Sequence, residues 1–404
     1  MKVLRHATLL TMAPAYAKDG RRLVPGDEGQ VEDGAIVHHD DVIRWVGADA
    51  DLPPEFASLP VEDLTGHVIT PGLVDAHTHL LFGGDRADEY VQRLNGVDYQ
   101  QIAAAGGGIL FTVRETLKLS EDQLFILGVE RLERIYSYGV RTVEMKSGYA
   151  LTQEGELTCL RAMKRLKQWF EGRIRLYATF LGAHAVPRHF SSSTDYVRAV
   201  VLPTLTAAHR EGLVDGVDAF HEEGYFSADD TRAIFAAATK LGLRCRLHAD
   251  EFKDNGGASL AVAFNALSAD HLLRTGDAGI KALAASPSVA TLLPGTAFFL
   301  GKPLANARGL LDAGAKVAIA SDFNPGSCHC DNVLMVASFA APALRMNQAE
   351  LWAAITLNAS HALGFIDQGA LIPGMRASLT VFRSSRVAQI TYNWGRNLAV
   401  LESV

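Results

Sequence analysis

Eight apolar, β-branched runs alternate with amphipathic stretches between residues 68 and 360, and this repeat limits the possible folds more than any other feature. Such alternation is typical of βα units around a parallel sheet. The expected strands cover residues 68–79, 140–146, 174–184, 216–221, 243–248, 267–271, 288–294 and 316–322. Helices are expected at residues 121–138, 154–170, 194–210, 228–241 and 304–313, several opened by Ser, Thr or Asp. Eight units predict an α/β protein with a closed (β/α)8 barrel of the TIM type.

The two ends of the chain have a different character. Residues 1–67 are short apolar runs broken by Gly, Pro and Asp, and residues 369–404 are similar, with apolar runs at 379–382 and 389–392. Both segments are typical of β-structure. The sequence therefore predicts a small β-sandwich domain made of residues 1–67 plus 369–404, beside a barrel domain of residues 68–368.

Charge and hydropathy narrow the class of partner. A formal net charge of -7 leaves no basic excess for phosphate contacts, so no nucleic-acid partner is expected. No apolar run has membrane-spanning length and the start of the chain lacks a cleavage pattern, so we expect a cytoplasmic protein with no membrane association. The four cysteines are too few for a disulfide framework and are expected to be reduced thiols.

A pair of histidines ends the first expected barrel strand, in the segment Asp75-Ala76-His77-Thr78-His79. Alternate residues of a strand face the same side, so His77 and His79 point together toward the barrel mouth. Two imidazoles in this arrangement can hold one metal ion.

Other strand ends carry side chains of the same kind. The fifth strand ends in His248, the sixth in His271 and the eighth in Asp322. Barrel enzymes keep their catalytic groups at this end of the strands. Four strands that finish in His, His, His and Asp therefore predict a metal-dependent catalytic centre.

The predicted ligands of one divalent ion are His77, His79, His248 and Asp322. A His3Asp set accepts zinc or iron, so the sequence leaves the metal open. The fourth strand ends in Phe220-His221-Glu222, without a lysine that could bridge a second ion. One ion is therefore favoured over two.

The chemistry predicted for this centre is hydrolysis. A water bound to the ion would have its pKa lowered toward about 7, which supplies hydroxide at neutral pH. Glu251, three residues after His248, is suited to take the proton and pass it to a leaving nitrogen. His271 would hydrogen-bond the hydroxide or polarise the substrate carbonyl, and Asp322 would help to fix the hydroxide. The predicted catalytic residues are therefore Glu251, His271 and Asp322.

Longer motifs add a resemblance. They lie at residues 70–79 (TPGLVDAHTH), 82–86 (FGGDR), 104–109 (AAGGGI), 144–149 (EMKSGY), 179–184 (TFLGAH), 248–251 (HADE) and 321–326 (SDFNPG). On these motifs the chain resembles the amidohydrolase superfamily and, more narrowly, the imidazolonepropionase family of histidine degradation. The first motif is class-specific only. The combination of Arg86, Tyr149, His184 and the segment after Asp322 is narrower.

The resemblance implies hydrolysis of 4-imidazolone-5-propanoate, a small molecule, with opening of its ring to N-formimidoyl-L-glutamate. It also implies a homodimer. Arg86 can hold the propionate through a two-pronged, charge-assisted hydrogen bond. The substrate contacts that the resemblance implies are Arg86, Tyr99, Tyr149, His184, Glu251, Asn324, Gly326 and Ser327.

Two other functions stay open at this point. A nucleobase or aminoimidazole deaminase of the same superfamily would use a similar metal set, but a neutral base does not require the carboxylate-binding group of Arg86, Tyr149 and His184. A metal-free scaffold protein would have lost some ligands, whereas this chain retains all four.

Two segments lie outside these assignments. The Gly106–Gly108 run is expected to form a flexible loop that could cover the barrel mouth. Cys328-His329-Cys330 departs from the family pattern, and packed thiols are favoured there over a second metal site.

Overall fold

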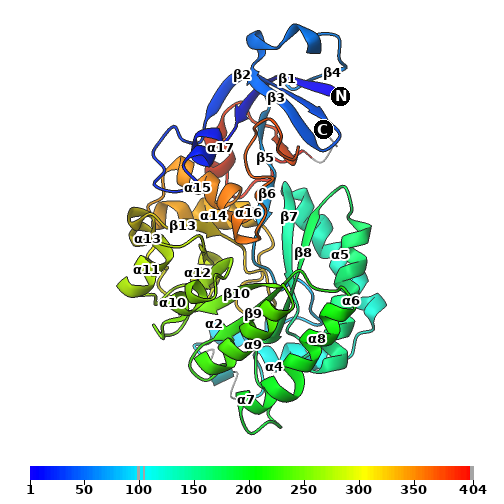
Figure 1. Ribbon diagram of the computed structural model, residues 1–404, viewed down its shortest axis with the longest axis vertical. Helices are drawn as coiled ribbons and strands as arrows, with labels where there is room; N and C mark the ends of the chain where they lie inside the picture. The colour runs from blue at the N-terminus through cyan, green and yellow to red at the C-terminus, as the bar shows by residue number, and fades with distance from the viewer. Residues whose placement is uncertain (98–100, 103–104, 401–404) are drawn as a thin grey trace.

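The computed structural model describes residues 1–97, 101–102 and 105–400. A six-stranded sheet lies at one end of the molecule, and below it a ring of parallel strands is surrounded by helices (Figure 1). The structure therefore confirms the predicted α/β class, with a (β/α)8 barrel and a β-rich unit built from both ends of the chain.

The barrel consists of eight parallel strands that follow one another in chain order. They are β6 (Leu73–Asp75), β7 (Val140–Lys146), β8 (Arg175–Ala183), β9 (Gly216–His221), β10 (Arg244–Ala249), β11 (Ser268–His271), β12 (Val289–Leu292) and β13 (Lys316–Ile319). The ring closes just beyond β6 and β13, where Thr78 and Phe323 form a parallel bridge. The N–H of His79 donates to the carbonyl of Phe323 over 2.9 Å. This closure brings the first and last strand ends to one rim.

The terminal unit is a mixed sheet in the order β14-β5-β1-β2-β3, with β4 paired to β1. Its strands are β1 (Lys2–Leu10), β2 (Gln30–His39), β3 (Val42–Ala48), β4 (Val61–Asp63), β5 (Val68–Pro71) and β14 (Leu379–Phe382). The single strand expected at 68–79 is therefore wrong, because the chain leaves this sheet after β5 and enters the barrel at β6. Gly72 lies at the crossing, where a Cβ atom would come 2.5 Å from Oγ of Ser378.

Helices cover the outside of the barrel and fill the connections. They are α1 (Ala13–Ala17), α2 (Ala87–Leu94), α4 (Ile109–Thr116), α5 (Glu121–Ser137), α6 (Gln153–Trp169), α7 (Ser193–Tyr196), α8 (Leu202–Arg210), α9 (Ala228–Lys240), α10 (Gly257–Ala263), α11 (Asp277–Ala284), α12 (Pro294–Phe299), α13 (Ala307–Ala313), α14 (Val333–Ala343), α15 (Gln348–Ala354), α16 (Leu357–Ala362) and α17 (Val387–Tyr392). Short 3-10 turns occur at η1 (Asp49–Asp51) and η2 (Pro54–Phe56), and a π-helical turn at η3 (Val197–Val201) precedes α8.

Local sequence signals explain several helix starts. Ser120 and Ser227 form capping boxes with Gln123 and Asp230, at the starts of α5 and α9. The β-structure expected at 389–392 is wrong, because this segment lies in α17. Val387 and Ile390 are both buried there, and their spacing of three residues fits one face of a helix.

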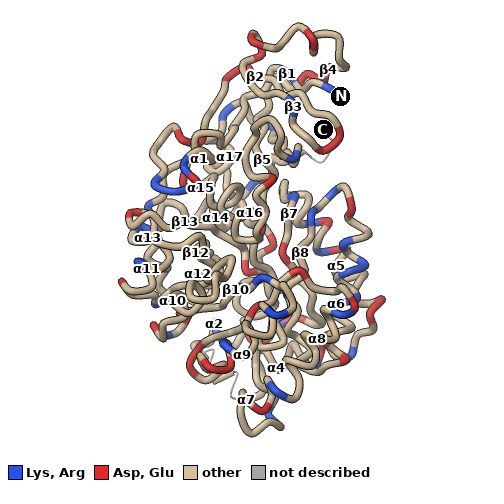
Figure 2. The backbone as a smooth tube through the Cα atoms, viewed as in Figure 1, with Lys and Arg blue, Asp and Glu red and all other residues tan. Residues whose placement is uncertain are grey.

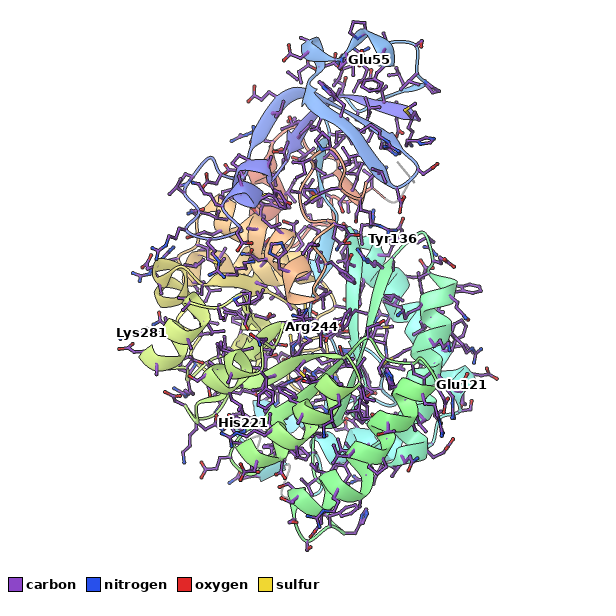
Figure 3. All side chains as sticks on the ribbon, viewed as in Figure 1. Glu55, Glu121, Tyr136, His221, Arg244 and Lys281 are labelled. Carbon is purple, nitrogen blue, oxygen red and sulfur yellow. The ribbon has the colours of Figure 1, made fainter. Side chains whose placement is uncertain are left out.

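The interior is apolar between the barrel and its helices, but several buried charged side chains lie within the barrel itself. Figure 3 shows the side chains that fill the molecule, with Glu121 of α5 and Lys281 of α11 at opposite flanks. Acidic and basic residues of the outer helices are interspersed (Figure 2). No helix within the described part of the chain is long and apolar enough to span a membrane.

Candidate active site

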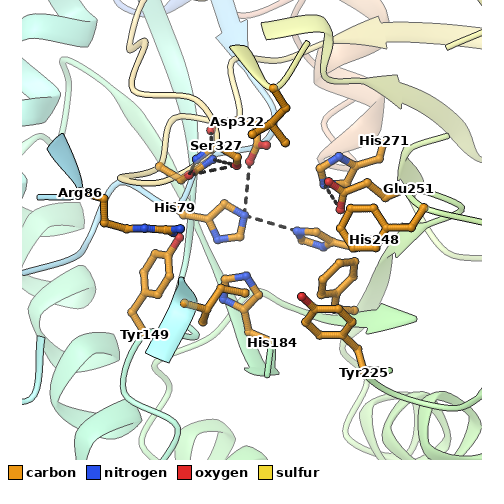
Figure 4. Close-up of a pocket in the computed structure, with 15 residues that line it drawn as sticks. His79, Arg86, Tyr149, His184, Tyr225, His248, Glu251, His271, Asp322 and Ser327 are labelled. Atoms are coloured by element: carbon orange, nitrogen blue, oxygen red, sulfur yellow. Dashed lines mark hydrogen bonds and ion pairs between the residues drawn. The ribbon is translucent and has the colours of Figure 1, made fainter. Parts of the chain in front are cut away.

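Three histidines from two strand ends meet at the rim of the barrel. Nε2 of His77 lies 3.2 Å from Nε2 of His79. Nε2 of His79 in turn lies 3.3 Å from Nε2 of His248 (Figure 4). All three side chains are buried and could hold one metal ion. The expected pairing of His77 and His79 with His248 therefore has the geometry of a ligand set.

Asp322 joins this group from the segment after β13. Its Oδ1 lies 3.5 Å from Nε2 of both His77 and His79. The backbone of Asp322 has a φ of 53°, a left-handed conformation that is costly for a residue other than glycine and is concentrated at functional sites. Burial raises the pKa of Asp322 to about 6, against the opposing effect of a hydrogen bond from the Thr296 hydroxyl.

Two carboxylates orient the histidines from behind. Oδ2 of Asp270 lies 2.7 Å from Nδ1 of His77, and Oδ2 of Asp218 lies 2.9 Å from Nδ1 of His248. An ionised carboxylate only accepts hydrogen bonds, so each Nδ1 carries the hydrogen and each Nε2 presents a lone pair. Nδ1 of His79 has no such partner within the described residues, so Nε2 of His79 can offer either its N–H or a lone pair to the other two imidazoles across 3.2 and 3.3 Å. With the lone pair in place, three nitrogen donors face one point. The donor set therefore fits a divalent cation.

Protonation does not relieve this arrangement. Burial lowers the pKa of His77 and of His79 well below the ordinary value, with further lowering by Lys146 and by the neighbouring histidines. The imidazoles are therefore neutral, which is the form that binds a metal.

A second group of metal-type side chains, His6, Asp33 and Asp49, lies in the terminal sheet unit. His6 and Asp33 are exposed, and Arg5 binds both carboxylate oxygens of Asp49 over 2.7 and 2.5 Å. The charge of Asp49 is therefore already balanced.

Glu251 lies in the loop that follows β10, facing the sixth strand end. Its Oε2 is 3.8 Å from Nε2 of His271, which ends β11. Burial raises the pKa of Glu251 well above the ordinary value, and the charges of Asp322 and Glu222 add to the effect. The loop is held by Glu222, whose Oε2 accepts the N–H of Phe252 over 2.8 Å. Glu251 and His271 are thus brought together as expected.

Arg86, just before α2, reaches the same cavity from the opposite side (Figure 4). Its Nε donates to Oε2 of Glu89 over 2.7 Å, and Oε1 of Glu89 accepts the N–H of Gly108 over 2.9 Å. Gly326 packs against the guanidinium so closely that a Cβ atom there would come 1.8 Å from Nη1. Glu89 and Gly326 therefore fix the position of Arg86.

Tyr149 and His184 line the cavity between the arginine and the histidines. The ring of His184 stacks on His79 with centroids 4.9 Å apart, and its Nδ1 donates to the carbonyl of Gly148 over 3.0 Å. Nε2 of His184 is therefore an acceptor, and burial followed by the charge of His248 lowers the pKa of His184 to about 3. The hydroxyl of Tyr149 points toward Arg86 in Figure 4.

The loop after Asp322 is held by its own hydrogen bonds. Oδ1 of Asn324 accepts the N–H groups of Gly326 and Ser327, each over 2.8 Å, and Nδ2 of Asn324 donates to the carbonyl of Asp322. Asn324 and Ser327 line the cavity, whereas Gly326 acts through its lack of a side chain. Tyr99 lies outside the described residues.

Several side chains of the site were not identified from the sequence. The cavity is also lined by Ile109, Phe220, Tyr225, Phe252 and Leu300, and the ligands are supported by Thr296, Asp218 and Asp270. Alternation along β9 and β10 could have indicated Asp218, which pairs with the strand that carries His248. The sequence holds no comparable signal for the apolar residues that line the cavity.

Cys328 and Cys330 do not belong to a metal-type group within residues 1–97, 101–102 and 105–400. Cys328 is buried and Cys330 is half-buried. Burial raises the pKa of the Cys328 thiol well above its usual range. Packed, protonated thiols therefore describe this cluster.

Comparisons with known proteins agree with this geometry. The amidohydrolase family matches residues 68–399. The imidazolonepropionase of Paracoccus denitrificans is 41% identical over 98% of this chain and 97% of its own length, and that of a Ruegeria species is 43% identical over 96% of each. A mutant atrazine chlorohydrolase from Arthrobacter aurescens, complexed with zinc and atraton, superposes with a TM-score of 0.67 at 18% identity, covering 96% of this chain and 88% of that one.

The site and the sequence relatives lead to the same assignment. The atrazine chlorohydrolase shares the fold at 18% identity, whereas the two imidazolonepropionases are more than 40% identical over nearly the whole chain. The chain belongs to the amidohydrolase family and, within it, to the imidazolonepropionases.

Proposed function

We propose that the chain hydrolyses 4-imidazolone-5-propanoate to N-formimidoyl-L-glutamate in histidine degradation. The observation that carries this proposal is one buried cavity with Arg86 on one wall and a histidine–carboxylate cluster with Glu251 on the other. A substrate with a carboxylate at one end and a cyclic amide at the other matches these two walls. The relatives named imidazolonepropionase support the same reaction.

We propose that His77, His79, His248 and Asp322 bind one divalent ion, zinc or iron. The close approach of three buried Nε2 atoms and the neighbouring buried carboxylate support this assignment. The atrazine chlorohydrolase of similar fold is complexed with zinc, which favours zinc as the ion here, and imidazole ligands suit iron as well. When bound, such an ion supplies Lewis-acid chemistry to a carbonyl and to water.

Glu251 moves the proton in the proposed reaction. Its carboxylate takes a proton from the attacking water, whose oxygen adds to the ring carbonyl carbon. The same carboxyl group returns the proton to the ring nitrogen as the carbon–nitrogen bond breaks, and the carboxylic acid that forms loses its remaining proton to solvent to give the carboxylate product. The raised pKa of Glu251 suits both steps, because the group must accept a proton and then release it near neutral pH.

His271 and His184 act on the substrate rather than on this proton. Nε2 of His271 lies 3.8 Å from Oε2 of Glu251, and His271 can hydrogen-bond the oxygen that becomes negative in the tetrahedral state. His184 offers Nε2 as an acceptor for a ring N–H, because its Nδ1 is committed to Gly148.

The substrate propionate is assigned to Arg86. Glu89 holds Nε and Nη2 of the guanidinium, each over 2.7 Å, and Nη1 occupies the space that a side chain at position 326 would fill. The hydroxyl of Tyr149 points to the same place, and Ser327 lies on the adjoining wall. These groups give the carboxylate a fixed position and hold the ring over the histidines. Asn324 shapes this wall through its loop.

A substrate panel tests the proposal. Protein loaded with zinc or iron should consume 4-imidazolone-5-propanoate and leave cytosine, guanine and adenosine unchanged. Turnover of a base without the imidazolone would assign the chain to the deaminases. Purified protein that retains less than about a tenth of an equivalent of metal and turns over nothing would indicate a scaffold.

The location and assembly remain predictions. We propose a cytoplasmic enzyme that acts on its small-molecule substrate as a homodimer, which is what the family resemblance implies. Light scattering on the purified protein measures the assembly directly.

A further inference from the structure

Lys146, the last residue of β7, lies among three buried carboxylates next to the metal-type histidines. Its Nζ is 2.6 Å from Oδ2 of Asp218, 2.9 Å from Oε1 of Glu144 and 3.8 Å from Oδ2 of Asp270. All four side chains are fully buried. A buried cation is costly unless it is well paired, so a lysine at this position requires a reason.

Two of the carboxylates that Lys146 contacts are those that orient the histidines. Asp218 lies 2.9 Å from Nδ1 of His248, and Asp270 lies 2.7 Å from Nδ1 of His77. The ammonium group of Lys146 therefore contacts two carboxylates, and each of these carboxylates contacts one imidazole of the proposed ion site.

Arg246 supports the other side of this network. Its Nη2 lies 3.4 Å from Oδ2 of Asp270 and its Nε lies 3.2 Å from Oε1 of Glu144. Nη2 also donates to the carbonyl of Ala76, the residue before His77, over 2.6 Å. Asp270 therefore has a second cation, whereas Lys146 is the one lysine or arginine paired with Asp218 among the described residues; Oδ1 of Asp218 also accepts the N–H groups of Ala219 and His248.

Lys146 carries one of the two positive charges of this network. Three carboxylates, Glu144, Asp218 and Asp270, face two cations, Lys146 and Arg246. The five side chains therefore carry one net negative charge, which would become two without the lysine. Without the lysine, Glu144 and Asp218 would repel each other in a buried site where charges interact strongly. Asp218 would then move away from His248.

We propose that Lys146 is a positioning residue of the metal site. Lys146 holds Asp218, and together with Arg246 it holds Asp270. These two carboxylates fix the orientations of His248 and His77, and this slows the release of the ion. This inference rests on the metal site of the proposed function and deepens it, because it names the residue that sets how long the ion stays.

The test measures the release of Zn²⁺ from fully loaded protein to a chromogenic chelator. We expect K146M to release the ion about tenfold faster than the unsubstituted protein, the lower end of the range for losing a group that hydrogen-bonds a metal ligand, because Lys146 acts through Asp218. K316M is the matched control, because Lys316 is a buried lysine of β13 whose Nζ pairs with Asp19 over 2.7 Å at the other end of the strand. K316M should release the ion at the unsubstituted rate. Equal rates for K146M and the unsubstituted protein would overturn the inference.

A double-substitution cycle tests the route through Asp218. In a D218N background, K146M should change the release rate by less than about twofold, because the group through which it acts is already altered. The absorption spectrum of the Co²⁺-loaded protein should also change in K146M and not in K316M. A full effect of K146M in the D218N background would contradict the proposed route.

A second pair of variants and the choice of assay allow each outcome to be interpreted. If K146M fails to fold, K146M/E144Q removes one charge of each sign, and its release rate is compared with that of E144Q. The release assay needs no substrate, so the outcomes separate. Protein that never retains Zn²⁺ or iron contradicts the proposed function and this inference together. Active protein with an unaltered rate in K146M contradicts this inference alone.

Discussion

Nδ1 of His77 lies 2.7 Å from Oδ2 of Asp270, although the two residues are 193 positions apart in the chain. His77 follows the first barrel strand and Asp270 lies in the sixth. The contact crosses the interior of the barrel, so the closed ring brings a ligand and its orienting group together. The catalytic rim is therefore a product of the whole barrel.

Replacement of Glu251 tests the proton transfer. E251Q keeps the size of the side chain but cannot take a proton, so kcat should fall about 10²- to 10⁴-fold. Metal content should stay that of the unsubstituted protein, as measured by elemental analysis. E223Q is the control, because Glu223 lies nearby at the surface and pairs with Lys253. An E251Q enzyme with normal kcat would exclude the residue from this role.

Glu89 should act on substrate binding more than on turnover. E89Q weakens the hold on Arg86 and on Gly108, so the carboxylate-binding group loses its fixed position. We expect KM to rise about tenfold, equivalent to about 1.4 kcal/mol, with kcat changed much less. Steady-state kinetics measure both constants. E115Q is the control, because Glu115 of α4 pairs with Lys118 rather than with Arg86, and it should leave KM unchanged. A loss confined to kcat in E89Q would contradict the role assigned to Glu89.

Arg131 of α5 should stabilise the segment between the histidines and Arg86. Its Nη1 donates to the carbonyls of Leu80 and Phe82 over 2.7 and 2.8 Å, and its guanidinium lies 3.7 Å from the centre of the Phe82 ring. R131M leaves both buried carbonyls without this donor and should lower the free energy of unfolding by about 2–4 kcal/mol. Urea denaturation measures the change. R134M, at a more exposed position three residues later, should change the free energy of unfolding by less than about 0.5 kcal/mol. A similarly small loss of stability in R131M would show that water replaces the guanidinium as the donor.

The barrel and the meeting of the predicted ligands followed from the sequence because they depend on local pattern. Apolar runs identify strands, and residues such as His248 and Asp322 occur where those runs end. Alternation places His77 and His79 on one side of the chain, and barrel closure is the only further step that their meeting requires.

The supporting groups did not follow because they depend on contacts between distant segments. Asp218 lies within a run that otherwise indicates a buried strand, and only the packed barrel shows that it pairs with Lys146 and His248. The division of residues 68–79 at Gly72 depends on Ser378, more than 300 positions away. The helix at 387–392 was missed because a short apolar segment fits both periodicities until its packing partners are known.

His361 provides a test of pH dependence away from the active site. The residue lies at the end of α16, and burial, followed by the nearby charge of Lys316, lowers its pKa to about 4. Nζ of Lys316 is 3.3 Å from Nδ1 of His361, so a protonated ring would face a second cation. The unfolded chain has no such constraint and takes up the proton near pH 6.5.

The sign of the effect follows from this difference in pKa. Above about pH 6.5 the His361 ring is neutral in both the folded and the unfolded chain, so it has no effect on the pH dependence of stability. Between about pH 6.5 and 4 the ring binds more protons in the unfolded state than in the folded state. The free energy of unfolding should therefore fall as the pH falls through this range, by at most about 3 kcal/mol from this residue. H361Q cannot take up the proton in either state, so urea denaturation at a series of pH values should give it a shallower acidic slope than the unsubstituted protein. H209Q, at an exposed position of α8, is the comparison. Parallel slopes for H361Q and the unsubstituted protein would mean that the buried ring is protonated as readily in the folded state as in the unfolded one.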